Sequence, residues 1–222
     1  MKSAKALEVS YLTIRRSLGG IGLGMSWLMW LATYLDGFTG PQPSISSYYF
    51  TNAGNLFVGI MTALALFLVC YRGYGRPDDV VSTVAGVAAL GIALFPDVSA
   101  DSPPADYLFH RQLGLDTTRN IHFAAAGIFF GLLALMSGFL FTRTDTRPGH
   151  RPTRQKLWRN NVYRACAAII AMAIVCVGVV TYLPYDCPIR TCNPVFWLET
   201  VALTAFGASW LVKGDTLLRD GT

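Results

Sequence analysis

Charge is what this sequence lacks most. Asp, Glu, Lys and Arg together make up 14% of the 222 residues, whereas a typical soluble domain has about 25%. Hydrophobic residues reach 53%, and the mean hydropathy is +0.41. A soluble protein of this length needs a charged surface, and this chain has too few charges to form one. The composition therefore predicts a polytopic membrane protein and argues against a disulfide-rich scaffold, a disordered tail or a nucleic-acid module.

Several functional motifs are also missing. The chain has no G-x-G-x-x-G pattern, no phosphate-binding loop and no internal repeat of the kind found in many transporters. Its apolar stretches lack the period-two alternation of outer-membrane barrel strands. No apolar stretch is broken by a proline at mid-membrane depth, so small-solute transport ranks third among the functions considered. We expect residues 1–222 to form a single transmembrane helical domain.

Six stretches have, or nearly have, the roughly 20 apolar residues that a helix needs to cross a bilayer. They are Ser17–Leu35, Asn55–Tyr71, Val80–Pro96, Asn120–Thr142, Asn161–Leu183 and Pro194–Val212. The predicted fold is an all-α integral membrane bundle of six transmembrane helices. The third stretch is rich in small residues, which let helices approach closely, so we expect it at the centre of the bundle.

Basic residues divide unevenly between the two sides that these spans define. Of the 18 Lys and Arg residues, 15 lie on the side that carries the two termini, and only Arg111, Arg119 and Arg190 lie on the other. Because positively charged loops stay in the cytoplasm, both termini are expected to be cytoplasmic. We interpret the basic cluster Arg143–Arg159 as a signal that keeps this loop in the cytoplasm and attracts anionic lipid head groups, rather than as a nucleic-acid-binding patch.

Two short helices are expected outside the spans. Residues 1–16 suit a helix that lies on the cytoplasmic membrane surface. The longest outer loop, 97–119, contains Ser102, two prolines directly after it, and Gly114 further on. A serine cap, prolines in the first turn and a glycine at the end are typical of a helix, so we expect a short helix from Ser102 to Gly114. Tyr107, Leu108 and Phe109 on that helix indicate that it rests on the membrane surface as a lid.

Small residues four positions apart predict where spans pack closely. These pairs are Gly20/Gly24 in the first span, Ser82/Gly86 and Ala85/Ala89 in the third, and Ala167/Ala171 in the fifth, with Ala205, Gly207 and Ala208 in the sixth.

Two of the five cysteines, Cys187 and Cys192, lie together in the outer loop 184–193. A disulfide between them is favoured over a zinc site. The loop would face an oxidising compartment, and a C-x-x-x-x-C spacing without two further ligands is unusual for zinc. The other three cysteines are expected to be inert apolar residues within the spans.

Polar side chains at membrane depth are costly and usually face the bundle interior or a wet cavity. Asn55, His122 and Glu199 all lie near the outer ends of their spans, and Glu199 is about 8 Å down its helix among apolar neighbours. A carboxylate in that position needs a partner, and His122 and Arg119 are at similar height. We therefore expect an outward-facing pocket, lined by Asp36, Ser47, Tyr48, Asn55, Asp97, Arg119, His122 and Glu199.

The leading interpretation of this pocket is binding without reaction. The ligand would be a lipid-like or amphiphilic molecule, or a helix of a membrane-protein partner or of a second copy. Glu199 and His122 would hold its polar head, and Asn55, Asp97 and Tyr48 would complete the shell. A purely structural interpretation is that the same groups hydrogen-bond across helices and only fix the bundle.

The second interpretation is catalytic. A divalent metal held by His122 with Asp97, Asp101 or Glu199 would activate water to hydrolyse a lipid ester or amide. Zinc usually takes two or three nitrogen or sulfur ligands, and His110 is the only other histidine on the outer side. No resident cofactor is predicted, and a divalent metal remains an open alternative.

Several patches resemble a widespread bacterial family of multipass proteins of unknown function. They are 44–49 (SISSYY), 56–60 (LFVGI), 71–74 (YRGY), 93–97 (ALFPD), 121–123 (IHF), and Glu199 with 206–214 (FGASWLVKG). The resemblance covers most of the chain and implies a helical protein of the bacterial inner membrane, without an activity.

A serine, an aspartate and a membrane histidine are, more distantly, similar to elements of the alkaline ceramidase and adiponectin-receptor hydrolase superfamily. In that superfamily three histidines hold zinc, two of them spaced H-x-x-x-H on a late helix. This chain has no such pair, and its last span has no histidine.

Overall fold

The computed structural model describes residues 2–97, 107–143, 153–184 and 186–218, with side chains from residue 11 onward. Within these ranges the chain forms helices and loops without strands. The long helices are α1 (Lys2–Leu35), α2 (Gly54–Cys70), α3 (Arg76–Leu94), α5 (Leu115–Leu135) continued by the π-helix η2 (Met136–Leu140), α6 (Arg154–Tyr182) and α7 (Pro194–Lys213). Three short helices join them: η1 (Ser46–Phe50), α4 (Leu108–Leu113) and η3 (Pro188–Cys192).

Five of these helices are long and apolar enough to cross a membrane: α1, α3, α5 with η2, α6 and α7. Helix α2 is also apolar but has 17 residues. The prediction of an all-α chain with several membrane-spanning helices is confirmed at this level.

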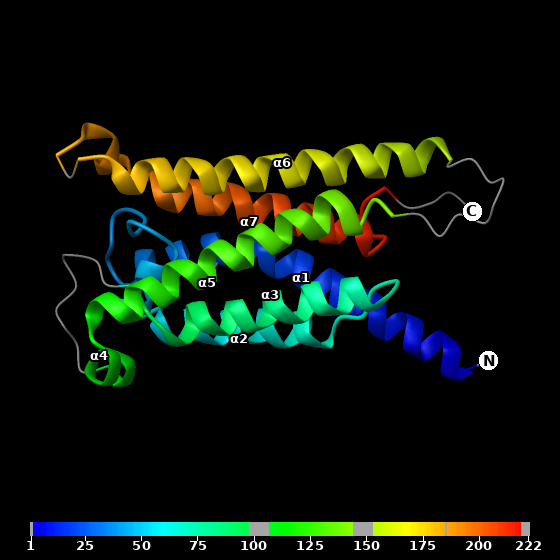
Figure 1. Cartoon of the computed structure of the whole chain (residues 1–222), viewed down its shortest axis with the longest axis horizontal. Coiled ribbons are helices and arrows are strands. Elements are labelled where there is room, and N and C mark those ends of the chain that lie inside the picture. The colour runs from blue at the N-terminus through cyan, green and yellow to red at the C-terminus, as the bar shows by residue number, and fades with distance from the viewer. Residues whose placement is uncertain (1, 98–106, 144–152, 185, 219–222) are drawn as a thin grey trace.

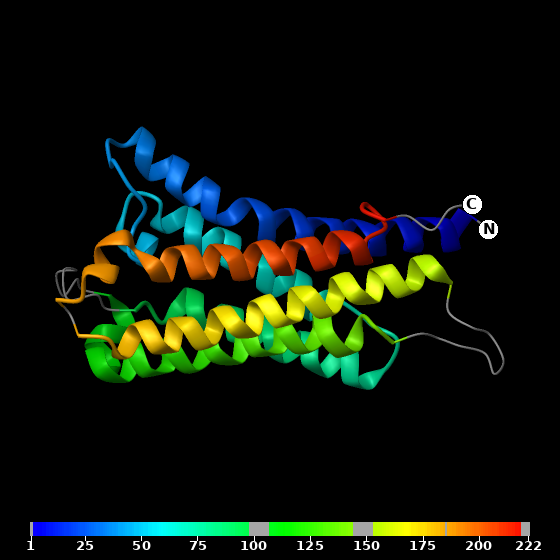
Figure 2. The same ribbon diagram turned by 90° about the horizontal axis from the view of Figure 1, so that it is seen from above.

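The long helices run side by side in a ring (Figures 1 and 2). Each packs against two neighbours in the order α1, α7, α6, α5, α3, α2, and the contact between α2 and α1 that closes the ring is the slightest. Helix α1 begins and α7 ends at one end, which we call the basic end; α4 lies at the other, the lid end (Figure 1).

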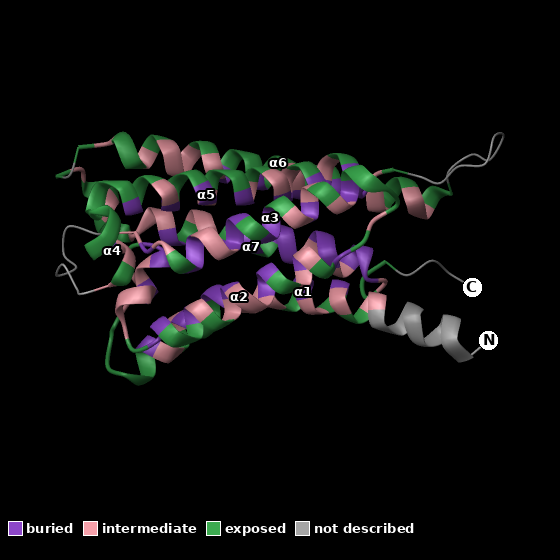
Figure 3. Ribbon diagram, turned by 60° about the horizontal axis from the view of Figure 1, so that its bottom comes forward, coloured by how far each residue is buried: buried purple, intermediate pink, exposed green. Residues whose placement is uncertain are grey.

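A cluster of large buried side chains lies at the basic end. Trp210 is fully buried, and its ring centroid lies 4.8 Å from that of Tyr71 and 5.0 Å from that of Phe141. Figure 3 shows the buried residues concentrated along α7 and towards this end. The apolar core therefore closes the basic end of the ring.

The predicted centre of the bundle was wrong. Helix α7 is the most buried of the five candidate spans, with 56% of its most apolar stretch buried against 44% for α3. The reason is that Val80, Val84 and Val87 turn one face of α3 outward. Helix α7 instead lies between α1 and α6 and packs extensively against both.

Glycines place α1 against α7, although not the predicted pair. A Cβ on Gly207 would lie 2.7 Å from the carbonyl oxygen of Gly19, and one on Gly22 would lie 2.8 Å from the Cα of Gly207. Neither Gly20 nor Gly24 approaches another helix. Spacing alone does not say which side of α1 faces its neighbour, and the side that meets α7 carries Gly19 and Gly22.

Other predicted small residues do lie at helix contacts. A Cβ on Gly86 would lie 2.7 Å from the carbonyl oxygen of Ala65, so α3 and α2 are in close backbone contact there. A Cβ on Gly138 would lie 3.0 Å from that of Ala167, which places Ala167 against η2.

The N-terminal segment is not a separate interfacial helix, because α1 runs unbroken from Lys2 to Leu35. No glycine or proline interrupts residues 2–18. The arginines at the predicted boundary are also held by α7: Arg15 Nη1 donates to the Lys213 carbonyl at 2.9 Å, and Arg16 Nε to the Gly214 carbonyl at 3.0 Å.

The predicted lid helix is present as α4, and Gly114 ends it with a φ of +81° that favours glycine. Ser102, the two prolines after it and Asp101 lie outside the described residues. Two of the three lid side chains pack on protein rather than on a membrane surface. Ring centroids lie 4.5 Å apart for Phe109 and Phe95, and 5.2 Å apart for Tyr107 and Tyr49.

Candidate functional site

Residues 41–50, which we call the connecting segment, join α1 to α2 and lie against the start of α7. Three hydrogen bonds attach them: from Asn193 Nδ2 to the Pro41 carbonyl (2.8 Å), from the Phe196 N–H to the Pro43 carbonyl (3.1 Å) and from the Ile45 N–H to Glu199 Oε2 (2.6 Å). Tyr48 is fully buried, with its ring centroid 6.1 Å from that of Phe196. The N-terminal end of α7 thus anchors the loop that leads to η1.

The partner of Glu199 is a backbone group of this segment. Ile45 directly precedes η1, and its N–H has no acceptor inside that short helix, so the carboxylate satisfies it. The expected approach of Arg119 to Glu199 does not occur. Arg119 instead pairs with the exposed Asp116, one turn away on the same face of α5, at 3.0 Å.

His122 is buried, and its ring hydrogen-bonds to the backbone at the end of α3. Its Nδ1 donates to the carbonyl of Phe95, the residue that follows the helix, at 2.7 Å. Helix ends leave carbonyls without intrahelical partners, and the ring satisfies one of them. Because the carbonyl only accepts, Nδ1 carries the proton, and the neutral ring has a lone pair left on Nε2.

Asp97 interacts electrostatically with both His122 and Glu199. The structure therefore brings together the three side chains that the sequence analysis placed at the heart of the pocket. They come from α5, α7 and the residues after α3, and two of them hold backbone groups of neighbouring segments.

This arrangement does not form a metal-ligand set. Among the described parts of the chain, no three His, Cys, Asp or Glu side chains are grouped as metal ligands. Asp101 lies outside those parts. His110, the other outer histidine, is buried with its Nε2 3.4 Å from the Pro96 carbonyl.

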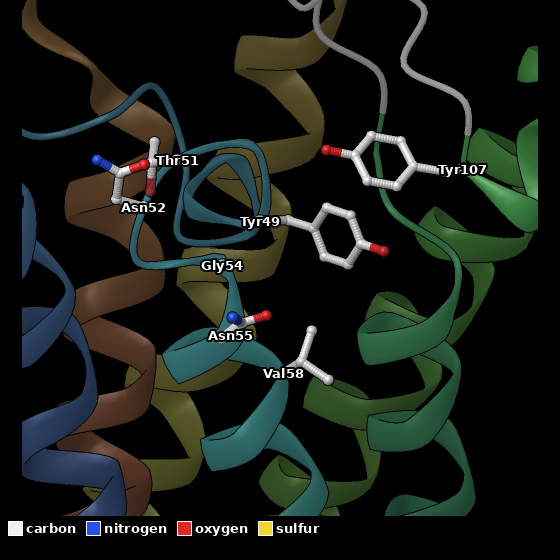
Figure 4. A pocket seen from close by; sticks show the side chains of 7 residues that line it. All are labelled: Tyr49, Thr51, Asn52, Gly54, Asn55, Val58 and Tyr107. Carbon is white, nitrogen blue, oxygen red and sulfur yellow. The ribbon is translucent and has the colours of Figure 1, made fainter.

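A cavity of about 390 Å³ lies beside the connecting segment. Its lining, shown in Figure 4, consists of Tyr49, Thr51, Asn52, Gly54, Asn55, Val58 and Tyr107. These residues come from η1, the turn after it, the first turns of α2 and the residue before α4. Every one of them is uncharged.

Three polar groups of this lining are open to a ligand. The amide of Asn55 is exposed, and neither it nor the hydroxyls of Tyr49 and Tyr107 hydrogen-bonds to another described residue. The two tyrosine rings meet edge to face, at 69° and 5.2 Å (Figure 4). Burial raises the pKa of Tyr49 above its ordinary value, and the nearby Tyr107 phenol adds to this shift, so the hydroxyl stays a neutral donor and acceptor.

The single pocket expected from the sequence is therefore divided. Asn55 lines the cavity, whereas Asp97, His122 and Glu199 lie near one another and do not line it. The Ser47 hydroxyl oxygen lies 2.7 Å from Ser44 Oγ, so its hydrogen bond is local to the connecting segment. Asp36 accepts a hydrogen bond from Asn52 Nδ2 and lines a second, smaller cavity of about 230 Å³.

Sequence reasoning missed six of the seven lining residues, four of which carry polar groups: Tyr49, Thr51, Asn52 and Tyr107. A signal existed, because the first three belong to the polar stretch 44–52 and the fourth begins the lid. The sequence alone does not show that the polar stretch 44–52 and the start of the lid meet over the start of α2.

The predicted disulfide is not formed, since Cys187 and Cys192 are both free thiols. The residues between them form η3. A 3₁₀-helix rises about 2 Å per residue, which separates the two Cα atoms by roughly 10 Å, beyond the ~7 Å that a disulfide can bridge.

Comparison with known proteins gives no family for this chain: no protein-family model matches it, and no curated protein or solved structure matches it either.

Proposed function

We propose that this protein binds the polar head of a lipid-like amphiphile in the cavity at its lid end. The observation that carries the proposal is the cavity itself, of about 390 Å³, lined by two tyrosines and an asparagine with open hydrogen-bonding groups. Ligand sites are typically concave and contain polar groups that set the orientation of the ligand, and this cavity has both features. Val58 and the apolar helix α2 adjoin these groups and would accept the ligand's hydrocarbon.

The same proposal takes α2 as a sixth transmembrane helix. Its 17 residues rise about 26 Å, close to the ~30 Å of a hydrocarbon core, and it closes the ring of helices between α3 and α1. With 15 of the 18 basic residues on the side of the termini, the basic end would face the cytoplasm. The lid end would then face outward, in the bacterial inner membrane that the family resemblance implies.

In this proposal Glu199 and His122 position the cavity instead of touching the ligand. The hydrogen bond from Ile45 to Glu199 holds the connecting segment, which contains Tyr49, and the hydrogen bond of His122 holds the end of α3 beneath the lid. Tyr49 and Tyr107 are then fixed relative to Asn55. The hydrolase alternative gains no comparable support, because its metal ligands are not grouped among the described residues.

The test is mass spectrometry of lipids that co-purify with the protein in mild detergent. Asn55→Phe would fill the cavity from its rim, and Asn161→Phe is the matched control on an exposed position of α6. We expect a lipid bound to the wild type and the control but lost from Asn55→Phe. Equal lipid in all three samples, or none in the wild type, contradicts the proposal.

A further inference from the structure

We infer that the head group bound in this cavity is uncharged and rich in hydroxyls, as in a sugar or glycerol. This inference rests on the proposed function and specifies its ligand. It starts from the described lining residues, which are tyrosine, threonine, asparagine, glycine and valine. Among the residues that the structure describes, no Lys, Arg, Asp or Glu contributes to that lining.

A phosphate head group would find little to hold it. Phosphates are recognised through arginine, lysine or clustered backbone N–H groups. Among the described residues of the lid end, the arginines are Arg111, Arg119 and Arg190, and the carboxylates are Asp36, Asp97, Asp116, Asp186 and Glu199. The described carboxylates outnumber the described arginines, so the net charge of this end does not draw an anion to the cavity.

Two of those arginines are also engaged elsewhere. Arg119 pairs with Asp116. Arg190 Nη2 donates to three carbonyls at the end of α6, those of Val180, Thr181 and Leu183, at 2.8 to 3.1 Å. Neither guanidinium is directed to the cavity. Arg111, on the exposed side of α4, is the remaining described arginine of this end, and it does not line the cavity.

A cationic head group fits poorly for a different reason. A quaternary ammonium is held by the faces of aromatic rings or by a carboxylate. Here the edge of one tyrosine ring meets the face of the other, at 69°, which covers part of the surface that an ammonium would use. Asp36, a carboxylate in contact with the lining residue Asn52, accepts a hydrogen bond from its amide.

Hydroxyl groups match what the cavity offers. A hydroxyl both donates and accepts, and so do the amide of Asn55 and the phenols of Tyr49 and Tyr107. Aromatic rings also supply flat apolar surface for the C–H face of a sugar ring. In Figure 4 Val58 lies one turn beyond Asn55 along α2, where a lipid tail would continue; a free saccharide would use only the polar part.

The experiment measures binding to the detergent-purified full chain by native mass spectrometry, with four probes added singly. The probes are a dihexosyl diacylglycerol, phosphatidylglycerol, phosphatidylcholine and free maltose. We expect the dihexosyl lipid to bind at least about tenfold more tightly than either phospholipid. Asn55→Ala should weaken it about tenfold through the lost hydrogen bonds, whereas Asn161→Ala should leave it unchanged. Tyr107→Phe should weaken it less, with Tyr182→Phe, an exposed tyrosine, as its control.

The outcomes separate the two proposals. If maltose alone binds as tightly as the dihexosyl lipid and responds equally to Asn55→Ala, the hydroxyl-rich class stands and the source is a soluble saccharide. If either phospholipid binds as tightly as the dihexosyl lipid and responds to Asn55→Ala, the head-group inference is overturned while lipid binding stands. If no lipid responds to Asn55→Ala, the proposed lipid binding fails as well.

Discussion

The two ends of the helix ring satisfy their helix termini with different sets of side chains. At the basic end, long cationic side chains donate hydrogen bonds to the backbone carbonyls at the ends of helices. Besides Arg15 and Arg16, Arg159 Nη2 donates to the Val212 carbonyl at 3.0 Å, so three arginines serve the last turn of α7. Lys156 Nζ donates to the carbonyls of Phe141 and Arg143, just beyond η2. Helix C-termini carry unpaired carbonyls and partial negative charge, which favours cations there.

At the lid end the helix termini are satisfied by a more varied set of side chains. Arg190 donates to three carbonyls at the end of α6. His122 takes the carbonyl after α3, and Glu199 takes the N–H before η1. These contacts hold the connecting segment and the lid in place, but they leave the cavity above α2 open.

The difference shows that one charge asymmetry serves two purposes. The Lys and Arg residues that predict orientation in the membrane are also the groups that close the basic end. Lys213 illustrates the closure: it is buried, with Nζ 4.6 Å from the ring centroid of Tyr74 and 5.3 Å from that of Phe141. A ligand cavity is therefore expected only where such side chains are scarce, at the lid end.

The largest effect is expected from Arg15→Met. The substitution removes two hydrogen bonds, to the Lys213 carbonyl and to the Tyr11 hydroxyl, in a buried place. We expect the free energy of unfolding to fall by about 2–4 kcal/mol, measured by chemical denaturation in detergent. Arg164→Met, at an exposed position of α6, should change it by less than about 0.5 kcal/mol. Equal effects from both substitutions would break the contrast between the ends.

A smaller effect is expected from Glu199→Leu at the lid end. Leucine leaves the Ile45 N–H without its acceptor, at a cost of about 1–3 kcal/mol. Glu199→Gln keeps a carbonyl oxygen there and should cost less. Hydrogen exchange at the Ile45 amide checks the local cause, because exchange should speed up in the leucine variant more than in the glutamine one. Unchanged exchange in both variants would show that this bond does not hold the connecting segment.

The smallest effect concerns alkaline pH. Burial raises the pKa of Tyr48 above its ordinary value of 10.0. The folded protein therefore keeps this phenol neutral where the unfolded chain begins to ionise, so its contribution to stability is constant below pH 10 and is lost as the pH rises above it. The fall in melting temperature above pH 10 should be shallower in Tyr48→Phe than in the wild type. Tyr34→Phe, at an exposed tyrosine, should follow the wild type.

Much of the fold was predictable because it depends on residue type along one helix at a time. Apolar runs located the long helices to within a few residues at most ends, and Gly114 marked the end of the lid helix. The start of α6 was placed too late. That helix begins at Arg154, where the side chain of Thr153 accepts a hydrogen bond from the Lys156 N–H in a cap placed among polar residues.

The site was predictable in part. Polar residues at membrane depth indicated Asn55, His122 and Glu199, and Asp97 was added from the end of the third span. The structure brings Asp97, His122 and Glu199 together, whereas Asn55 lines the cavity. Their partners were not predictable, because two of them are main-chain groups, the Ile45 N–H and the Phe95 carbonyl, which every residue possesses.

The sequence by itself determined that this chain is helical and apolar, with its basic residues gathered on one side, because these properties depend only on which residues follow one another. Only the tertiary structure decided that α1 meets α7 through Gly19 and Gly22, and that Tyr107 closes over Tyr49. Both depend on how a helix is rotated and where a distant loop comes to rest. The rotation of a helix and the position of a loop are set by packing across the whole ring of helices, so they cannot be predicted from any single segment.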